Sequence, residues 1–166
     1  KILYDMNDGL KYPDGAQMDL AVSGSDFGTR VFRSAFRYAG EVMQRGMPRN
    51  DRLVAPDEAE IRQIRAKLGI REGERVLLYA PTFRDATVGG EQKADFDIRR
   101  ALDALEGSTG RKWRCLVRAH DLNRGILCGA GATDVSAYPE MSDLLLISDL
   151  LITDYSSSAG DYVLLD

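Results

Sequence analysis

The chain has 166 residues, of which 44% are hydrophobic and 29% are charged, and its formal net charge is −4. This composition is typical of a globular protein with one domain, or one domain and part of another. The acidic balance argues against a general nucleic-acid binder, and no apolar run approaches the roughly 20 residues that a membrane-spanning helix needs. The two cysteines lack a CxxC or histidine-rich context, which argues against a zinc site.

The first part of the chain predicts a strand, a helix and a second strand. Residues 18–25 predict a buried strand that ends in a helix cap at Ser25 or Asp26. Apolar residues then recur at helical spacing over 27–38, and residues 41–48 predict a short strand closed by glycine and proline. We expect these elements to be the end of an N-terminal domain.

A domain boundary is predicted by the polar segment that follows. Residues 49–56 have the polarity and the proline of a connector. The predicted organisation is therefore the tail of an N-terminal Rossmann-like domain (1–48), a linker (49–56) and a truncated C-terminal domain (57–166). Because the chain begins with Lys1 and its last residues stop inside a predicted helix, we expect a piece of a longer protein.

Strands and helices alternate in the C-terminal part of the chain. The predicted strands are 75–84, 112–120, a short one at 133–138 and 150–153, and the predicted helices are 57–69, 98–105, 139–148 and the segment from Ser156. Pro139 is expected at the first position of its helix. Alternation of this kind, with nearly continuous apolar strands, predicts an α/β fold with a Rossmann-like parallel sheet covered by helices.

Polar side chains follow three of these strands. Thr82 and Arg84 follow the first strand, Arg118 and His120 follow the second, and residues 154–158 follow the last. Ligands of open parallel sheets bind beyond the carboxyl ends of the strands. Two arginines, one histidine and several hydroxyls at one edge predict a site for a phosphate or pyrophosphate.

The serines after the last strand have two interpretations. Ser156 and Ser157 stand where a helix is predicted to begin, and the free N–H groups of a helix N-terminus attract anions. Alternatively, Ser156 is only the N-cap of that helix, a role worth about 1 kcal/mol. We favour the anion site because basic and hydroxyl residues are predicted at the same edge.

The other candidate residues also have more than one interpretation. His120, the single histidine, is either a surface or core residue or a cation that stabilises a leaving group beside a pyrophosphate. Asp154 is a base, a ribose ligand or a structural acceptor of backbone N–H bonds, and we slightly favour the last. Arg84 and Arg118 alternatively pair with acidic neighbours, and Thr82 is alternatively a turn residue.

Other motifs are given no catalytic role. The glycines of 125–131 do not form a GxGxxG motif after a strand, so no dinucleotide site is expected. A Ser-His-Asp hydrolase is rejected because the chain has no GxSxG motif. Tyr155 is expected to be a packing residue.

Several stretches of the chain, taken together, resemble one protein family. They are GMPRND (46–51), YAPTFR (79–84), RAH (118–120), SDLLITDYSS (148–157) and DLAVSGSDFGTRVFRSAF (19–36). In this order they resemble the CDP-glycerol glycerophosphotransferase family, which includes teichoic acid primases, polymerases and capsule-forming relatives. The resemblance covers most of the chain from about Asp19.

This resemblance implies a fold and an activity. The fold would be GT-B, in which two Rossmann-like domains face a cleft, with the C-terminal domain and the tail of the N-terminal domain present here. The activity would be transfer of glycerol phosphate, or ribitol phosphate, from a CDP-activated donor to a hydroxyl of a growing polymer, without a metal or other cofactor. The acceptor would be a lipid-linked polymer at the inner face of the cell membrane. The enzyme would be cytoplasmic and peripheral, with membrane contact through segments outside this chain.

The resemblance also assigns roles to individual residues. His120 would be the catalytic residue that contacts the donor phosphates, and Ser156 and Ser157 would bind phosphate. The residues implied to line the same pocket are Thr82, Arg84 and Arg118.

Three departures from the family pattern qualify the expected activity. Asp121 stands where the family usually has proline, which would alter the charge of the neighbouring histidine or the shape of the loop. Ala159 and Gly160 replace bulkier apolar residues. The family's other essential histidine, the proposed base for the acceptor hydroxyl, would lie upstream of Lys1. We therefore expect no turnover by this chain alone.

Two other functions remain as alternatives. One is a UDP-sugar-dependent GT-B glycosyltransferase, because its phosphate-binding chemistry would be similar. The other is a nucleotide-binding module that keeps the fold without the reaction. The sequence does not distinguish a glycerol from a ribitol donor, or a primase from a polymerase.

Overall fold

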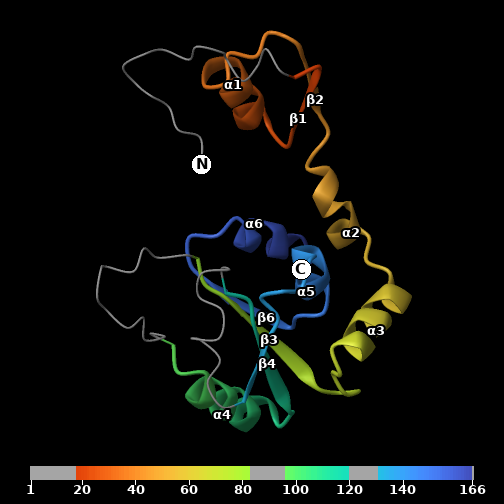
Figure 1. Cartoon of the computed structure of the whole chain (residues 1–166), viewed down its shortest axis with the longest axis vertical. Coiled ribbons are helices and arrows are strands. Elements are labelled where there is room, and N and C mark those ends of the chain that lie inside the picture. Colours follow the sequence, from red (N-terminus) through yellow and green to blue (C-terminus); the bar gives the residue numbers. More distant parts are fainter. Residues whose placement is uncertain (1–17, 83–95, 120–130, 166) are drawn as a thin grey trace. The chain divides into compact units, whose positions relative to one another are not determined.

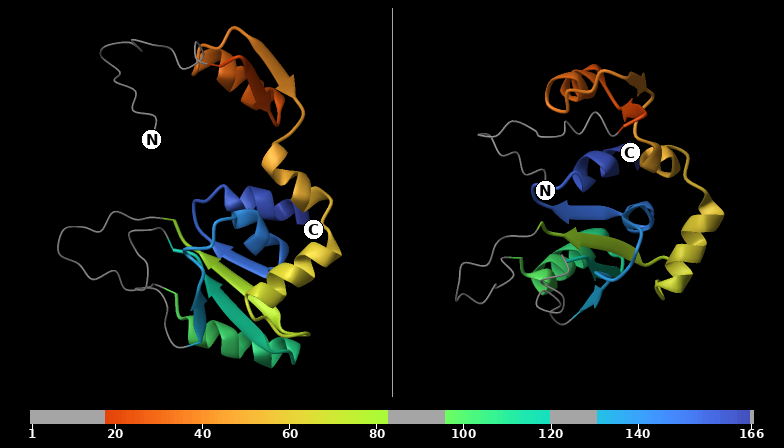
Figure 2. Two further views of the ribbon diagram at one scale, coloured as in Figure 1. Left: turned by 45° about the vertical axis from the view of Figure 1, so that its right-hand side comes forward. Right: turned by 45° about the horizontal axis from the view of Figure 1, so that its top comes forward.

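A computed structural model describes residues 18–82, 96–119 and 131–165 of the chain (Figure 1). The chain divides into two compact units, residues 1–51 and 52–166. Figure 2 shows the elements of each unit from two further directions.

The described part of the first unit is a strand–helix–strand element. Strands β1 (Leu20–Ser23) and β2 (Glu41–Gln44) pair in parallel, and helix α1 (Asp26–Ser34) connects them. The Ser25 side chain caps α1 by accepting a hydrogen bond from the backbone N–H of Gly28 at 3.1 Å. The predicted strand–helix–strand order and the cap are therefore confirmed.

The segment predicted as a polar connector is largely helical. A 3₁₀ turn, η2 (Pro48–Asn50), leads into helix α2 (Asp51–Val54). Leu53 in α2 is only 2% exposed and belongs to a hydrophobic core of the second unit. Burial of one leucine side chain stabilises by about 1.5–3 kcal/mol, which favours an ordered helix over an irregular connector. The division between the two units falls inside this segment.

The second unit contains a four-stranded sheet in which every pair is parallel, in the order β5–β4–β3–β6. Its strands are β3 (Arg75–Ala80), β4 (Trp113–Val117), β5 (Ala132–Asp134) and β6 (Leu150–Thr153). In the register, Leu78 of β3 lies between Leu116 of β4 and Leu151 of β6. This sheet confirms the predicted parallel α/β fold.

Helices cover both faces of the sheet, as Figure 1 shows. They are α3 (Glu58–Lys67), α4 (Ile98–Thr109), α5 (Met141–Leu146) and α6 (Ser158–Tyr162), which the 3₁₀ turn η4 (Val163–Leu165) follows. The alternation of side chains along β3 separates two cores. Val76 and Leu78 pack in the core that includes α3 and α5, whereas Leu77 packs in the core that includes α4.

Two helices of the second unit begin later than predicted. Helix α5 begins at Met141 with Glu140 as its N-cap, so Pro139 precedes the helix rather than opening it. The reason is a turn before it, in which the N–H of Tyr138 bonds the carbonyl of Val135 at 2.9 Å. Helix α6 begins at Ser158.

Ser157 stands at the N-cap position of α6, but its side chain makes no capping hydrogen bond. The Ser156 Oγ instead accepts the backbone N–H of Ser158 at 3.2 Å, which is the kind of bond that the alternative interpretation of Ser156 as a helix cap expects. The backbone N–H of Ser156 bonds the carbonyl oxygen of Asp154 at 2.7 Å, in a turn directly after β6. The turn displaces the start of the helix by two residues and leaves Ser156 between strand and helix.

Candidate functional site

The strand order of the second unit creates a topological switch point between β3 and β6. The chain moves from β3 outward to β4 and β5, and then returns to the other side of β3 to form β6. In chain order these strands are arranged 3-2-1-4, which is the first part of the Rossmann arrangement. Helix α4, which follows β3 in the chain, packs in one core, and residues of α6 and η4, which follow β6, pack against the other. In folds with this arrangement, ligands bind beyond the carboxyl ends of the strands at the switch point.

Thr82 and Asp154 meet at this switch point. The backbone N–H of Thr82, two residues after β3, donates to Oδ1 of Asp154 at 2.7 Å. The neighbouring Thr153 hydroxyl donates to the carbonyl oxygen of Ala80 at 2.6 Å. These bonds hold the two strand ends together. Among the three roles considered for Asp154, this geometry is that of a structural acceptor of a backbone N–H bond.

Two of the serines after β6, Ser156 and Ser158, form hydrogen bonds with each other. The Ser156 Oγ accepts a hydrogen bond from the backbone N–H of Ser158 at 3.2 Å and lies 3.0 Å from the Ser158 Oγ. Ser157 is exposed, and its hydroxyl makes no capping hydrogen bond within the described part of the chain.

Tyr155 is 98% exposed, so its expected role as a packing residue is wrong. A side chain on the solvent side of this turn has no core to pack against.

Arg118 lies at the same edge, at the end of the neighbouring strand. Its backbone N–H donates to the carbonyl oxygen of Tyr79 at 2.9 Å, which extends the β3–β4 ladder, and its Nη1 atom is buried. The next backbone N–H, that of Ala119, donates to the buried hydroxyl of Ser136 at 2.9 Å. The path of the chain immediately before His120 is therefore fixed by the sheet.

Two of the predicted site residues, Arg84 and His120, lie outside the described residues. Arg84 comes two residues after Thr82, and His120 comes two residues after Arg118. The structure thus brings together the strand ends that carry Thr82, Arg118 and Asp154. The roles assigned to all these residues stay predictions.

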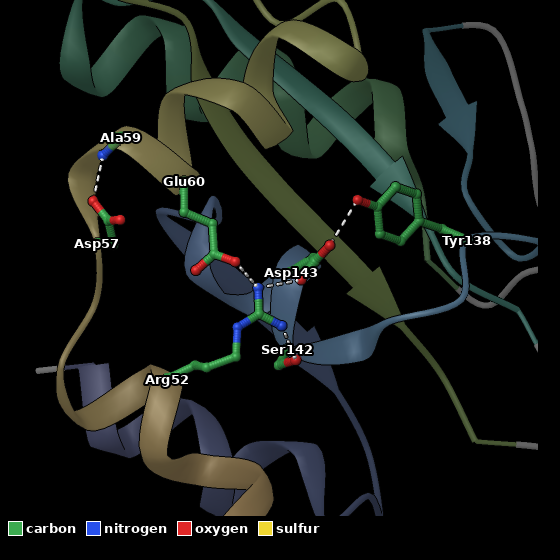
Figure 3. Close-up of polar contacts among 7 residues, drawn as sticks. All are labelled: Arg52, Asp57, Ala59, Glu60, Tyr138, Ser142 and Asp143. Atoms are coloured by element: carbon green, nitrogen blue, oxygen red, sulfur yellow. Dashed lines mark hydrogen bonds and ion pairs between the residues drawn. The ribbon is translucent and has the colours of Figure 1, made fainter.

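A second polar cluster was missed by sequence reasoning (Figure 3). Arg52 of α2 donates to Glu60 of α3 at 2.5 Å and to Asp143 of α5 at 2.7 Å. Asp143 also accepts a hydrogen bond from the Tyr138 hydroxyl at 2.8 Å. This cluster fastens three helices to one another. The sequence shows acidic residues in the first turns of α3 and α5, but no local pattern indicates that they contact Arg52.

The cluster shifts the protonation equilibria of two of its members. Burial, together with the hydrogen bond to Asp143, raises the pKa of Tyr138 to about 12. Hydrogen bonds to Glu60 and Asp143 raise the pKa of Arg52. A phenol with so high a pKa stays protonated near neutral pH, so this cluster is suited to structural support rather than proton transfer.

Comparison with known proteins places the chain in a family. A family profile described as CDP-Glycerol:Poly(glycerophosphate) glycerophosphotransferase matches residues 10–166. The teichoic acid poly(glycerol phosphate) polymerase of Staphylococcus epidermidis is 39% identical over 157 residues, which cover 90% of this chain and 22% of that polymerase. The teichoic acid glycerol-phosphate transferase of Staphylococcus aureus is 34% identical over 160 residues, which cover 93% of this chain and 41% of that transferase.

Solved structures agree with this result. The structure of the wall teichoic acid polymerase TagF superposes with a TM-score of 0.74 and 38% sequence identity, covering 91% of this chain and 38% of that one. A histidine variant of that polymerase, soaked with CDPG for 30 minutes, superposes with a TM-score of 0.73.

The parallel sheet, its strand order and this structural match define a Rossmann-like domain of the GT-B type, with the tail of a preceding domain, as predicted. The chain belongs to the CDP-glycerol:poly(glycerophosphate) glycerophosphotransferase family. It spans about a fifth to two fifths of the length of these curated relatives. Within the described residues, no helix is both long enough and apolar enough to cross a membrane.

Proposed function

We propose that this chain is part of an enzyme that transfers glycerol phosphate, or ribitol phosphate, from a CDP-activated donor to a hydroxyl of a teichoic acid or capsule polymer. Relatives named for poly(glycerol phosphate) and for ribitol-phosphate polymerisation support this proposal. A TagF structure soaked with CDPG, which we take to be CDP-glycerol, supports the identity of the donor.

The observation that carries the proposal is the switch point in a member of this family, where Thr82 and Asp154 join the ends of β3 and β6. We propose that the donor pyrophosphate lies along this edge. Arg118, Ser156 and Ser157 would bind its oxygens, together with Arg84. Guanidinium groups and hydroxyls suit this task because charge-assisted hydrogen bonds to phosphate are short and strong.

The proposed reaction is a displacement at phosphorus. The hydroxyl oxygen of the acceptor attacks the phosphorus that carries the glycerol, and the hydroxyl proton passes to a base that this proposal places outside the present chain. The bond from this phosphorus to the bridging oxygen breaks, and CMP leaves. His120 would donate a proton to the departing phosphate or stabilise its charge as a cation. The proposal includes no metal or other cofactor. It also includes a lipid-linked acceptor at the inner face of the membrane, reached through segments outside this chain.

The alternatives have less support. A UDP-sugar donor would use similar phosphate contacts, but the relatives reported above are named for glycerol phosphate or ribitol phosphate. A module that only binds a nucleotide would use the same sheet edge without the reaction. A titration with nucleotides distinguishes the proposal from the UDP-sugar alternative and is therefore the first test.

The test is a calorimetric titration of the purified chain with CDP, and with UDP as the competing nucleotide. We expect CDP to bind more tightly than UDP, and His120→Ala and Ser156→Ala each to weaken binding about tenfold or more, because each removes a group that contacts phosphate. Ser108→Ala is the matched control, since Ser108 is an exposed serine on α4 whose hydroxyl bonds the Leu105 carbonyl. A folded chain that binds neither nucleotide would contradict the proposal, and tighter UDP binding would favour the glycosyltransferase alternative.

A further inference from the structure

An arginine-rich cavity lies at the opposite edge of the same sheet, by the amino ends of the strands. Its volume is about 550 Å³, which is within the usual range of ligand pockets. The five arginines that line it are Arg62, Arg65, Arg71, Arg75 and Arg111. The proposed donor site does not use this cavity, because that site is proposed at the carboxyl ends of the strands.

Two of the five arginines are used by the fold. Arg65 donates to the backbone carbonyl oxygens of Ile147, at 3.2 Å, and of Glu74. Arg75 forms an ion pair with Asp149, whose other carboxylate oxygen accepts from the backbone N–H of Val76 at 2.8 Å. These two side chains hold the turn and the strand ends in place.

The other three arginines are not neutralised by a partner among the described residues. Arg62, Arg71 and Arg111 are exposed, and their guanidinium groups contact no hydrogen-bonding or ion-pair partner among the described residues. Of the three carboxylates in the lining, Asp149 is paired with Arg75.

Glu74 is the second carboxylate, and it pairs with Arg114 at 3.3 Å. Only the exposed Glu72 is left to offset the three guanidinium groups. The cavity therefore carries local positive charge in a chain whose net charge is −4.

A second cavity of about 280 Å³ adjoins the first. The two share Arg75, Arg111 and Asp149 in their linings, and the second adds Thr109 and Trp113. Two adjoining cavities at the same sheet edge suit an extended ligand better than a single compact ion.

We propose that this arginine cavity binds a phosphodiester polyanion, namely a stretch of the glycerol phosphate polymer. The planar guanidinium group matches phosphate geometry, and three of them in one cavity suit a ligand with repeated phosphates. The identity of the polyanion rests on the proposed function, in which such a polymer is the acceptor. Binding it away from the donor edge would keep the polymer near the enzyme between transfers and raise its effective concentration.

The observations favour a polymer over a membrane surface. The site is concave, and the exposed large hydrophobic side chains of the described residues, such as Phe27 and Val163, are not in its lining. Membrane-surface binding normally combines basic residues with an apolar face that enters the lipid. This cavity has the basic residues but no apolar face beside them.

The test measures binding of a short synthetic glycerol phosphate oligomer to the ¹⁵N-labelled chain, by NMR of the arginine side chains and by fluorescence anisotropy. We expect the side-chain signals of the cavity arginines to shift on titration. The triple variant Arg62→Gln, Arg71→Gln and Arg111→Gln should bind the oligomer at least about tenfold more weakly.

The matched control removes the same charge elsewhere, through Arg30→Gln, Arg99→Gln and Arg100→Gln, which are exposed positions on α1 and α4. Circular dichroism checks that both triple variants are folded. The proposal is overturned if the two triple variants lose affinity equally, or if the wild-type chain does not bind the oligomer. It is also overturned if vesicles of phosphatidylglycerol and phosphatidylcholine bind through these arginines while the oligomer does not. CDP is titrated in parallel: a chain that binds the oligomer but not CDP would support this site and contradict the proposed donor site.

Discussion

The carboxylate of Asp154 connects two strands that are distant in the sequence. It accepts the backbone N–H of Thr82 at 2.7 Å, across 72 residues of chain. This partly buried N–H lies two positions before Arg84 in the sequence. The same bond therefore stabilises the fold and sets the start of a segment that we propose contacts the donor.

Removal of this acceptor is expected to destabilise the protein. Asp154→Ala leaves the N–H of Thr82 without this partner, and we expect the free energy of unfolding to fall by about 1–3 kcal/mol. Asp154→Asn keeps an oxygen at the same place and should cost less. Urea unfolding of both variants checks this, and equal losses would show that the hydrogen bond is not the cause.

Tyr138 gives the molecule a pH dependence in the alkaline range. Its pKa is about 12 in the folded chain, compared with about 10 for an ordinary tyrosine. Below pH 10 the phenol is protonated in both the folded and the unfolded chain. Between about pH 10 and 12 only the unfolded chain loses this proton, so the free energy of unfolding falls as the pH rises.

The substitution Tyr138→Phe should remove that component. We expect a tyrosinate absorbance titration of the wild-type chain to contain a late step that is missing from this variant. Tyr155→Phe, at an exposed position, should leave the late step in place. A late step that survives Tyr138→Phe would assign it to another tyrosine.

Residue types at the strand ends were predictable, whereas their contacts were not. Periodicity places Thr82, Arg118 and Asp154 at one edge because the strands are parallel. The cluster of Arg52 with Glu60 and Asp143 joins residues as far as 91 positions apart, and no local pattern carries that information. Exposure of Tyr155 was also missed, because its position depends on the turn that follows β6.

Local signals identified the helices and strands better than their ends. The strands of the second unit and the cap at Ser25 follow from apolar runs and from a serine before an amphipathic stretch. Helix α2 did not follow, because its order depends on the burial of Leu53 in a core assembled from distant segments. The start of α6 was misplaced because a turn after β6 takes up Ser156.

Two glycines near the end of α4 should respond to substitution with opposite signs. Gly107 lies inside the helix with open space around its Cα, so Gly107→Ala should stabilise by about 0.8–1 kcal/mol. Gly110 ends the helix with φ of +64°, so Gly110→Ala should destabilise by about 1–2 kcal/mol. Thermal unfolding of the two variants measures both effects, and a shift in the same direction for both would contradict this account of the helix end.

Both hydrophobic cores found among the described residues are formed by the second unit. Their buried residues, from Leu53 to Ile147, all fall within 52–166. The first unit contributes few buried side chains to the described structure, such as Ala21 and Tyr38. The second unit therefore contains the elements that a cooperative fold requires.

A shortened chain of residues 52–166 is accordingly expected to fold alone. Its thermal unfolding, followed by circular dichroism, should be a single cooperative transition with a midpoint close to the corresponding transition of the whole chain. A broad, gradual loss of signal in the shortened chain, under conditions where the whole chain unfolds cooperatively, would show that the first unit is needed for the fold.

The strand order also has a consequence for synthesis on the ribosome. β3 is translated well before its partner β6, because Ala80 and Thr153, which bond each other, are 73 positions apart in the sequence. Until β6 emerges, one edge of β3 presents unpaired backbone groups, and such edges are prone to wrong pairing. The switch point therefore does not exist until β6 has been translated, and the nucleotide binding that we propose there can begin only after that.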